Sequence, residues 1–291
     1  MNEFRAFTDL ERRLLERLST RVVPFRWGTA YLDAEFPTRY CSNFLLADTD
    51  LDAASPEDLI GAAEEILGGA GYEHRRLVVR GEPSAARLHS GFAMNGYEAA
   101  REVVLIHRRK PDRAGAREVE EVSFDGARAL IERAYREDAD LPPEVTASFT
   151  QQHRKFELVI GARFFVAQVN GMQAGHCELF VDGAAALVEN VGILERFRNK
   201  GVARSVVLRA LEAARKAGAI RTFIVADEED WPKELYQRLG FDPLGVDVPF
   251  TKSSSAPSGA TTVSGADASR IWRNQTFGSW APRDSNPEPA D

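Results

Sequence analysis

The chain has 291 residues and a formal net charge of −7. General binding to nucleic acid or to an anionic membrane depends on an excess of basic residues, which this chain does not have, so we expect neither partner. Hydrophobic residues make up 44% of the chain, enough for a sizeable core, and the only two cysteines, Cys41 and Cys177, provide neither a disulfide framework nor a metal site. We therefore expect no metal and a reducing, cytoplasmic location. The N-terminus lacks the apolar segment of a signal peptide, and no run reaches the ~18 apolar residues of a membrane span.

Composition divides the chain into three regions. Residues 1–112 read as a mixed α/β domain, and the polar stretch HRRKPDRAGARE (107–118) reads as a linker. Residues 119–250 form a second α/β domain. Residues 251–291 contain 25 Ser, Thr, Gly, Ala or Pro residues out of 41, too few apolar groups to offset the entropy of ordering, so we predict a mostly disordered tail. The alternative is that Trp272, Phe277 and Trp280 dock this tail onto a folded surface.

The first half alternates strands and helices. A strand NFLLAD (43–48) precedes the helix SPEDLIGAAEEILGG (55–69), where Ser55 is the N-cap, Pro56 the first helical residue and Asp58 the partner in a capping box. The stretch YEHRRLVVRG (72–81) is a strand. A short helix SAARLHSGF (84–92) and a strand AAREVVLIHRR (99–109) follow.

The second half begins with a helix at SFDGARALIERAYRE (123–137), whose apolar residues recur at helical spacing. The stretch LPPEVTASFTQQHRKF (141–156) is expected to be irregular, with at most one short helix. The runs RFFVAQV, MQAGHCELFV and AAALVENVGI then read as three antiparallel strands. Their junctions, Asn170-Gly171 and Asp182-Gly183, are typical two-residue hairpin turns with positive φ at both central residues.

A basic loop follows the third strand. The stretch RFRNKGVARS (196–205) places four cations around Gly201 just before an amphipathic helix that closes at Ala217-Gly218. A buried strand IRTFIVA (220–226) comes next. The last helix is expected to have Asp230 as its N-cap, Pro232 in its first turn and Gly240 just beyond its end. Because the first amides of a helix are unpaired and carry partial positive charge, a diphosphate fits this loop, although a solvated basic helix entrance is the plainer alternative.

Two stretches in this order, VENVGILERFRNKGVA (188–203) and ELYQRLGFDPLG (234–245), resemble the GNAT superfamily of N-acetyltransferases. The resemblance covers residues 119–250 and implies a GNAT fold with a mixed sheet and acetyl-CoA as the acyl donor. It implies that the backbone of Val191, Gly192 and Ile193 pairs with the pantetheine arm and polarises the acetyl carbonyl, beside a β-bulge where two strands part. The diphosphate would be held by the loop formed by Arg198, Asn199, Lys200, Gly201, Val202, Ala203 and Arg204.

The same resemblance assigns Tyr236 as the proton donor to the departing thiolate. Many relatives carry an asparagine seven residues before this tyrosine, where this chain has Glu229, so a contact through that asparagine is in doubt.

A general base is needed because an alkylamine has a pKa of about 10.4. Glu189 is our first candidate, acting through water, but strand register decides which face it occupies. Glu178 and His176 on the preceding strand are lesser candidates. Cys177 is interpreted as a buried small residue rather than as an acyl carrier.

The order of elements in the first half parallels that of the second. Aligning Gly91-Phe92 with Gly240-Phe241 places Arg87 at the position of Tyr236, and the acidic stretch TDLDAASPED replaces the basic loop. We interpret residues 1–112 as a degenerate, non-catalytic GNAT-like domain. An unrelated α/β domain is the alternative.

The sequence therefore predicts an acetyl-CoA-dependent N-acetyltransferase that acts by direct transfer in a ternary complex. The acceptor is a small-molecule amine or a protein amine, and the chain is a monomer or a homodimer. An acyl-CoA sensor or pseudoenzyme is the main alternative. Another phosphate-loop protein is disfavoured because Gly-x-x-x-x-Gly-Lys-[Ser/Thr] does not occur.

Overall fold

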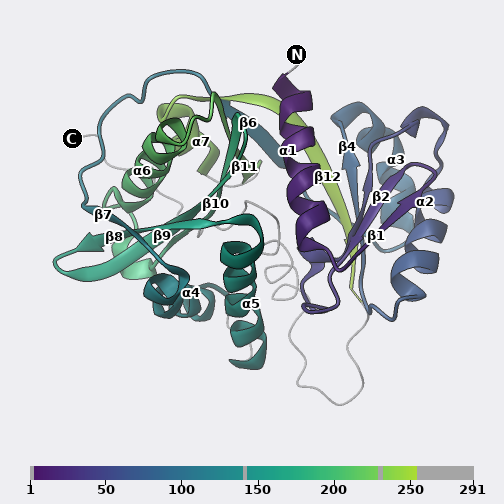
Figure 1. The fold of residues 1–291 in the computed structure, drawn as a ribbon. Helices are drawn as coiled ribbons and strands as arrows, with labels where there is room; N and C mark the ends of the chain where they lie inside the picture. The colour runs from purple at the N-terminus through teal and green to yellow at the C-terminus, as the bar shows by residue number, and fades with distance from the viewer. Residues whose placement is uncertain (1–2, 140–142, 229–231, 254–291) are drawn as a thin grey trace. The chain divides into compact units, whose positions relative to one another are not determined.

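The computed structural model describes residues 3–139, 143–228 and 232–253, and Figure 1 shows its elements. These residues divide into two compact units, each of which is discontinuous in sequence. Unit 1 contains residues 3–17 and the described part of 103–244, whereas unit 2 contains residues 18–102 and 245–253. Each unit thus takes one strand from the other half of the chain. The boundaries expected at 112 and 119 differ from this division, because the linker between them lies inside unit 1.

Unit 1 is a mixed sheet with helices on both of its faces (Figure 1). The strand order within the unit is β6-β11-β10-β9-β8-β7, in which β10 and β11 are parallel and the neighbours from β7 to β10 are antiparallel. The elements of the unit are α1 (Glu3–Leu18), β6 (Glu102–His107), β7 (Val119–Val122), α4 (Phe124–Ala139), α5 (Pro143–Lys155), a π-turn (Phe156–Ile160), β8 (Arg163–Val169), β9 (Met172–Asp182), β10 (Ala185–Ile193), a 3-10 turn (Glu195–Phe197), α6 (Val202–Lys216), β11 (Arg221–Asp227), α7 (Pro232–Arg238) and the start of β12 (Phe241–Lys252).

The two faces of the unit 1 sheet carry different helices. Cys177 of β9 donates a hydrogen bond to the carbonyl of Val206 in α6, whereas the next residue, Glu178, contacts His153 of α5. Successive side chains of a strand point to opposite faces, so α6 covers one face of β9, and α5, with its neighbour α4, covers the other.

Unit 2 also contains a run of antiparallel strands beside one parallel pair. Its strand order is β1-β2-β3-β4-β12, with a short β5 beside β12; β3 and β4 are parallel and the other neighbours are antiparallel. Its buried core lies between this sheet and two helices. The elements are β1 (Arg21–Phe25), β2 (Gly28–Leu32), a 3-10 turn (Tyr40–Ser42), β3 (Phe44–Ala47), a 3-10 turn (Leu51–Ala53), α2 (Pro56–Ala63), a π-turn (Glu64–Gly68), β4 (Arg75–Arg80), α3 (Glu82–Met94), β5 (Glu98–Ala99) and the remainder of β12.

Most of the expected elements are confirmed. The three-strand meander is present, and Asn170 and Gly171 form its first turn with φ values of 52° and 74°. Ser55 caps α2 in a full capping box with Asp58. Gly240, with a φ of 96°, lies just beyond α7.

Two local predictions are wrong. The stretch expected to be irregular forms the 13-residue helix α5. Its buried positions include Thr146, Thr150, Gln152 and His153, and a helix with polar residues on its buried face shows no apolar periodicity. In the second hairpin Asp182 pairs with Ala185, so the turn residues are Gly183 and Ala184 and only Gly183 has positive φ.

Two further predictions fall on residues that are not described. The proposed N-cap Asp230 and the substituted position Glu229 lie outside the described residues, as does the predicted disordered tail from residue 254 onward. Thr251 and Lys252, which we assigned to that tail, are the last residues of β12.

Candidate active site

The strands β10 and β11 separate in the middle of unit 1. Their parallel pairing runs from Ala185–Arg221 to Val188–Ile224 and extends no further along these two fully described strands. Beyond this point the register of β10 against β9 shifts between Glu189 and Gly192, which is the β-bulge expected there. Asn190 lies in the bulge with a φ of 51°, in the left-handed region that asparagine tolerates. The segment from Val191 to Ile193 therefore borders β11 without pairing to it.

The loop after β10 leaves its amides available. Within the described part of the chain, the amide N–H groups of Lys200, Gly201, Val202 and Ala203 donate to no protein acceptor. Gly201 is the N-cap of α6 with a φ of 70°, and no side chain caps this helix. Together with Asn199, which has a φ of 58°, this backbone forms a concave array of donors of the kind that binds anions.

The charge around this loop favours an anion as well. The first turn of α6 contains no acidic residue. The Arg196 guanidinium lies 4.6 Å from the centroid of the Phe197 ring, and the Lys200 ammonium lies 5.5 Å from it while donating to the carbonyl of Arg196 at 2.8 Å. These two cations are thereby held at the helix entrance.

The linker between β6 and β7 packs on the start of α6. Arg117 donates through Nε to the carbonyl of Lys200 at 2.7 Å, and its amide donates to the Ser205 hydroxyl at 3.1 Å. A Cβ at Gly115 would lie 3.0 Å from that hydroxyl oxygen, so the approach is close. Arg117 adds a cation to the loop that the sequence pattern did not reveal.

Arg204 is placed differently from the other cations. Its side chain is buried and forms an ion pair with Asp112 of the linker. Burial is the largest single influence on the pKa of Asp112 and raises it, but the hydrogen bonds and positive charges of Arg204 and Arg113 together outweigh burial and lower the pKa of that carboxyl. Arg204 therefore anchors the linker to α6 in this structure, and direct contact with a diphosphate stays a prediction.

The register of β9 against β10 settles the face that Glu189 occupies. Glu189 is the cross-strand partner of Glu178, and directly opposed residues of an antiparallel pair point to the same face. Both side chains are buried. Glu189 thus lies on the face covered by α4 and α5, opposite α6.

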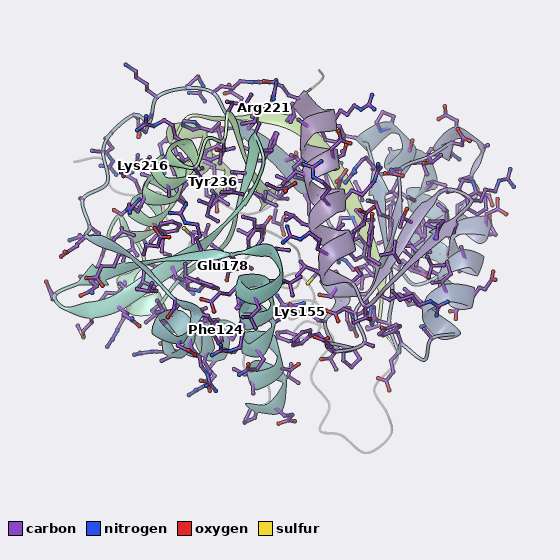
Figure 2. The ribbon with its side chains drawn as sticks, viewed as in Figure 1. Phe124, Lys155, Glu178, Lys216, Arg221 and Tyr236 are labelled. Carbon is purple, nitrogen blue, oxygen red and sulfur yellow. The ribbon has the colours of Figure 1, made fainter. Side chains whose placement is uncertain are left out.

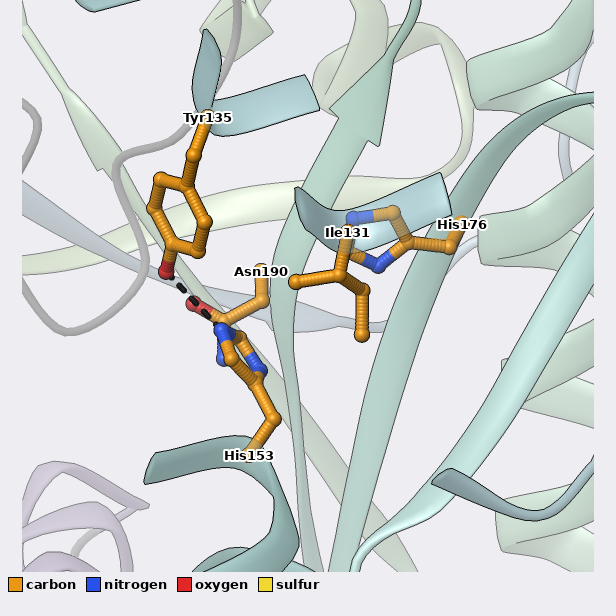
Figure 3. A pocket seen from close by; sticks show the side chains of 5 residues that line it. All are labelled: Ile131, Tyr135, His153, His176 and Asn190. Carbon is orange, nitrogen blue, oxygen red and sulfur yellow. Dashed lines mark hydrogen bonds between the residues drawn. The ribbon is translucent and has the colours of Figure 1, made fainter. Parts of the chain in front are cut away.

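A largely buried polar cluster lies on that same face, and Figure 3 shows its members Tyr135, His153 and Asn190. The Tyr135 hydroxyl from α4 lies 2.8 Å from Nε2 of His153, whose Nδ1 contacts Oε1 of Glu178. The side-chain amide of Asn190 donates to Oε2 of the same carboxylate at 2.9 Å. Tyr135, His153, Asn190, His176 and Ile131 line a small cavity of about 10 Å³, close to the volume that one water molecule requires.

Burial sets the protonation of two neighbouring groups. It lowers the pKa of His176 to about 3, with a further contribution from His153, so this imidazole is neutral at pH 7. Burial also raises the pKa of the Cys177 thiol, with the Glu178 charge acting in the same direction. Cys177 is therefore a buried thiol rather than a nucleophilic thiolate.

Tyr236 lies on α7, the helix that contacts β11. Its side chain is buried, with its ring centroid 6.1 Å from that of Phe241. Figure 2 shows Tyr236 and Glu178 within unit 1. Glu178 is on β9, which precedes the separated pair β10 and β11 in the sequence, and Tyr236 is on α7, which follows it.

The central part of unit 1 matches a known protein family. A family model described as "Acetyltransferase (GNAT) domain" matches residues 161–243. Residues 161–243 form a GNAT acetyltransferase domain. The match spans β8 to the start of β12 and includes both the bulge and the loop before α6. No match is found among curated proteins.

Solved structures extend the likeness in fold over most of the chain. A conserved protein of unknown function from Staphylococcus epidermidis is 16% identical with a TM-score of 0.66, over 82% of this chain and 96% of that one. A GCN5-related N-acetyltransferase from Kribbella flavida is 16% identical with a TM-score of 0.60, over 88% and 97%. A tandem GNAT protein from the clavulanic acid biosynthesis pathway is 17% identical with a TM-score of 0.51, over 69% and 70%. The GNAT domain thus lies in a two-unit chain whose fold matches these proteins.

Two kinds of feature are missing from the described residues. No group of three or more His, Cys, Asp or Glu side chains is arranged there to hold a metal ion. No described helix has the length and apolar character needed to cross a bilayer.

Proposed function

We propose that the GNAT domain transfers an acetyl group from acetyl-CoA to an amine by direct attack within a ternary complex. GNAT acetyltransferases are acyltransferases that use acyl-CoA, and the acetyl group, the amine acceptor and the direct route belong to the proposal. The observation that carries it is the set of unpaired amides of Lys200, Gly201, Val202 and Ala203 beside the separated ends of β10 and β11.

The donor set fits an acyl-CoA. The loop amides at the positive end of α6 would bind the diphosphate, with Arg196, Lys200 and Arg117 adding positive charge around them. The unpaired edge of β10 from Val191 to Ile193 would pair with the amide-bearing arm and direct an N–H at the acetyl carbonyl.

The remaining requirements fall on side chains of the same domain. An amine must lose its proton before it attacks, and the buried acidic face around Glu189 and Glu178 borders the bulge where the attack would take place. Tyr236 would donate its hydroxyl proton to the departing thiolate.

Ligand binding is the first test. Differential scanning fluorimetry with acetyl-CoA, CoA and ATP should show a rise in Tm for both CoA species, because a ligand that binds only the folded state stabilises it by mass action. No shift with either CoA species at millimolar concentration would contradict the proposal.

Catalysis is the second test. Thiol release from acetyl-CoA, measured with a panel of amines, should exceed the rate without amine, and Tyr236→Phe should lower kcat by about 10- to 100-fold with little change in acetyl-CoA affinity. Tight CoA binding with no thiol release across the panel would favour an acyl-CoA sensor instead.

A further inference from the structure

The buried cluster of Tyr135, His153, Glu178 and Asn190 has a directional arrangement. Both oxygens of Glu178 accept hydrogen bonds, one from His153 and one from Asn190. A carboxylate acceptor at Nδ1 of His153 requires the proton to be on that nitrogen, so Nε2 is left to accept from the Tyr135 hydroxyl. The chain of hydrogen bonds runs from a phenol to an imidazole to a carboxylate, which is the order in which protons move in general-base relays.

The location of this chain relates it to the site of transfer. Asn190 is both a member of the cluster and the bulge residue of β10, immediately before Val191. The cavity that Tyr135, His153 and Asn190 line has room for one water molecule and lies on the same sheet face as Glu189. Three of these polar side chains, Tyr135, His153 and Glu178, are buried and Asn190 is half-buried, which costs desolvation that apolar residues would avoid.

We propose that Tyr135, His153 and Glu178 form the proton-accepting relay that deprotonates the amine substrate, an inference that rests on the proposed acetyl transfer. The ammonium proton passes to the Tyr135 oxygen, directly or through one water in the cavity, while the Tyr135 hydroxyl proton passes to Nε2 of His153. The products are a neutral amine and an imidazolium paired with the Glu178 carboxylate. After transfer, the imidazolium returns its proton to solvent by the reverse path.

In this scheme Tyr135 is the catalytic residue, and His153 and Glu178 act through it. Asn190 is a positioning residue because its amide fixes the second oxygen of Glu178. The relay differs from a mechanism in which Glu189 is the general base, because that mechanism needs no histidine. It also predicts that the acceptor enters from the side of the sheet covered by α4 and α5, opposite the helix α6 that carries the diphosphate loop.

The identity of the proton acceptor follows from the groups that face His153. These are Tyr135 from α4, His176 and Glu178 from β9, and Glu189 on the same face of β10. His176 stays neutral because burial lowers its pKa to about 3. Of the two imidazoles, His153 is the one that contacts both the Tyr135 hydroxyl and Glu178, and it therefore takes up the proton in this relay.

The test compares two small amines with the same skeleton in the full-length protein, ethylamine and 2,2,2-trifluoroethylamine. Ethylamine is protonated at pH 7 and needs a base, whereas trifluoroethylamine is already neutral. Tyr135→Phe removes the hydroxyl and keeps the ring. We expect it to lower kcat/KM for ethylamine at pH 7 by about 100-fold or more and to leave kcat/KM for trifluoroethylamine within about threefold of wild type.

The pH profile separates this role from a structural one. With Tyr135→Phe, kcat/KM for ethylamine should rise tenfold per pH unit toward the alkylamine pKa of about 10.4, because only the free neutral amine reacts. The wild type should reach its plateau at lower pH. His153→Gln keeps a donor to Glu178 but accepts no proton, and we expect the same dependence on the amine, which protects the test if Tyr135→Phe folds poorly.

A matched control lies on the same helix as His153. Thr150→Val removes a buried hydroxyl that, among the described residues, bonds within α5 to the carbonyl of Thr146 at 2.8 Å, and we expect it to leave the ratio of kcat/KM for the two amines unchanged. Equal losses with both amines in Tyr135→Phe and His153→Gln would overturn the relay, as would unchanged ethylamine kinetics.

The failure of the relay can be told apart from failure of the proposed function. If acetyl-CoA raises Tm and the wild type acetylates either amine, acetyl transfer stands and the variants decide the relay alone. If acetyl-CoA binds and neither amine reacts, the relay is contradicted, because an intact base would activate any amine small enough to reach the cavity. If neither CoA species binds, the proposed function falls and the relay falls with it.

Discussion

Each unit contains a connection from a strand through a loop into a helix, and we call this strand-to-helix connection a corner. The two corners have the same topology and opposite chemistry. In unit 1 the chain passes from β10 through a loop into α6 and back along the parallel strand β11, and in unit 2 it passes from β3 through a loop into α2 and back along the parallel strand β4. At the start of α6 the amides of Gly201, Val202 and Ala203 donate to no acceptor among the described residues, and the first turn has no acidic residue. At α2 the Ser55 hydroxyl accepts from the amide of Asp58, and Pro56 has no amide proton to offer.

The side chains that follow these corners strengthen the difference. Arg87 of α3, at the position aligned with Tyr236, donates to the carbonyls of Ala54 and Leu51 in the loop before α2. The corner of unit 2 is therefore filled by groups of the chain itself, whereas the amides of unit 1 remain open to a ligand. We therefore expect this topology to bind an anion only where its helix start is not already capped, and the interpretation of the first half as a degenerate, non-catalytic GNAT-like domain stays a prediction.

The largest expected effect comes from giving the corner of unit 1 the charge found in unit 2. Gly201→Glu places a carboxylate at the N-cap of α6, where, apart from the adjacent backbone, no described atom lies within 4 Å of a Cβ added to the glycine. We expect acetyl-CoA affinity to fall by more than about 100-fold in isothermal titration calorimetry, because the carboxylate competes for the same amides.

Gly201→Ala is the matched control for this prediction. It carries the same backbone penalty at a φ of 70° without the charge, so binding should stay within a few-fold of wild type. Equal losses in the two variants would show that backbone strain rather than anion binding explains the result.

The next prediction concerns how closely the end of β10 and the start of α6 pack against Gly175 of β9. A Cβ at Gly175 would lie 2.8 Å from the carbonyl oxygen of Gly192 and 2.8 Å from Cγ1 of Val202. Gly175→Ala should lower the free energy of unfolding by about 1–3 kcal/mol and weaken acetyl-CoA binding, since β10 or α6 must move.

Gly61→Ala supplies the comparison in α2 of unit 2. Apart from the backbone of α2 itself, no described atom lies within 4 Å of a Cβ built at Gly61, and alanine in a helix interior should raise the free energy of unfolding by about 0.5–1 kcal/mol. Urea unfolding of both variants measures the contrast, and similar effects would show that the two corners are packed alike.

Acidification should destabilise both units through one buried histidine each. Burial lowers the pKa of His74 in unit 2 to about 4 and that of His176 in unit 1 to about 3. Since the unfolded chain takes up these protons below pH 6.5, stability falls as pH falls, and each histidine should cost about 2 kcal/mol between pH 7.5 and 5.

Urea unfolding of His74→Gln and His176→Gln at the two pH values measures this cost. Each variant should show a flatter pH dependence than the wild type. Parallel curves for wild type and variants would contradict the prediction.

The smallest expected effect is at the cap of α2. Ser55→Ala removes the acceptor for the Asp58 amide and should lower the free energy of unfolding by about 1 kcal/mol. It should create no acetyl-CoA site in unit 2, because Glu57, Asp58 and Arg87 remain. A second CoA-binding event in calorimetry of Ser55→Ala would show that the cap alone separates the two corners.

Local rules predicted the parts of the site that depend on backbone signals. Gly201 and the cations before it indicated the anion loop, Asn170-Gly171 indicated a hairpin turn, and Ser55 with Asp58 indicated the capping box, because each signal lies within a few residues of what it determines. The bulge at Asn190 was expected from family resemblance rather than from any local signal.

The buried cluster was not predicted, for a physical reason. His153 and Thr150 lie on the covered face of α5, so the search for apolar periodicity missed the helix that carries them. Tyr135 was interpreted as part of an amphipathic helix, and its partner His153 is 18 residues away. The face of Glu189 depended on strand register, which only the pairing of β9 with β10 supplies. The sequence feature that pointed toward the cluster was His153 in a polar stretch, and a histidine in such a stretch is not specific for a functional site.

The exchange of strands between the two halves of the chain has a consequence for synthesis. Residues 247–252 of β12 pair with β4 of unit 2. The sheet of unit 2, which begins near residue 21, is therefore completed only after the ribosome has translated residues 247–252. Until then β4 presents an open edge, which is a template for association with other chains. A gene fragment ending in the linker should therefore yield insoluble protein, and a protease cut in the same linker should leave two fragments that copurify.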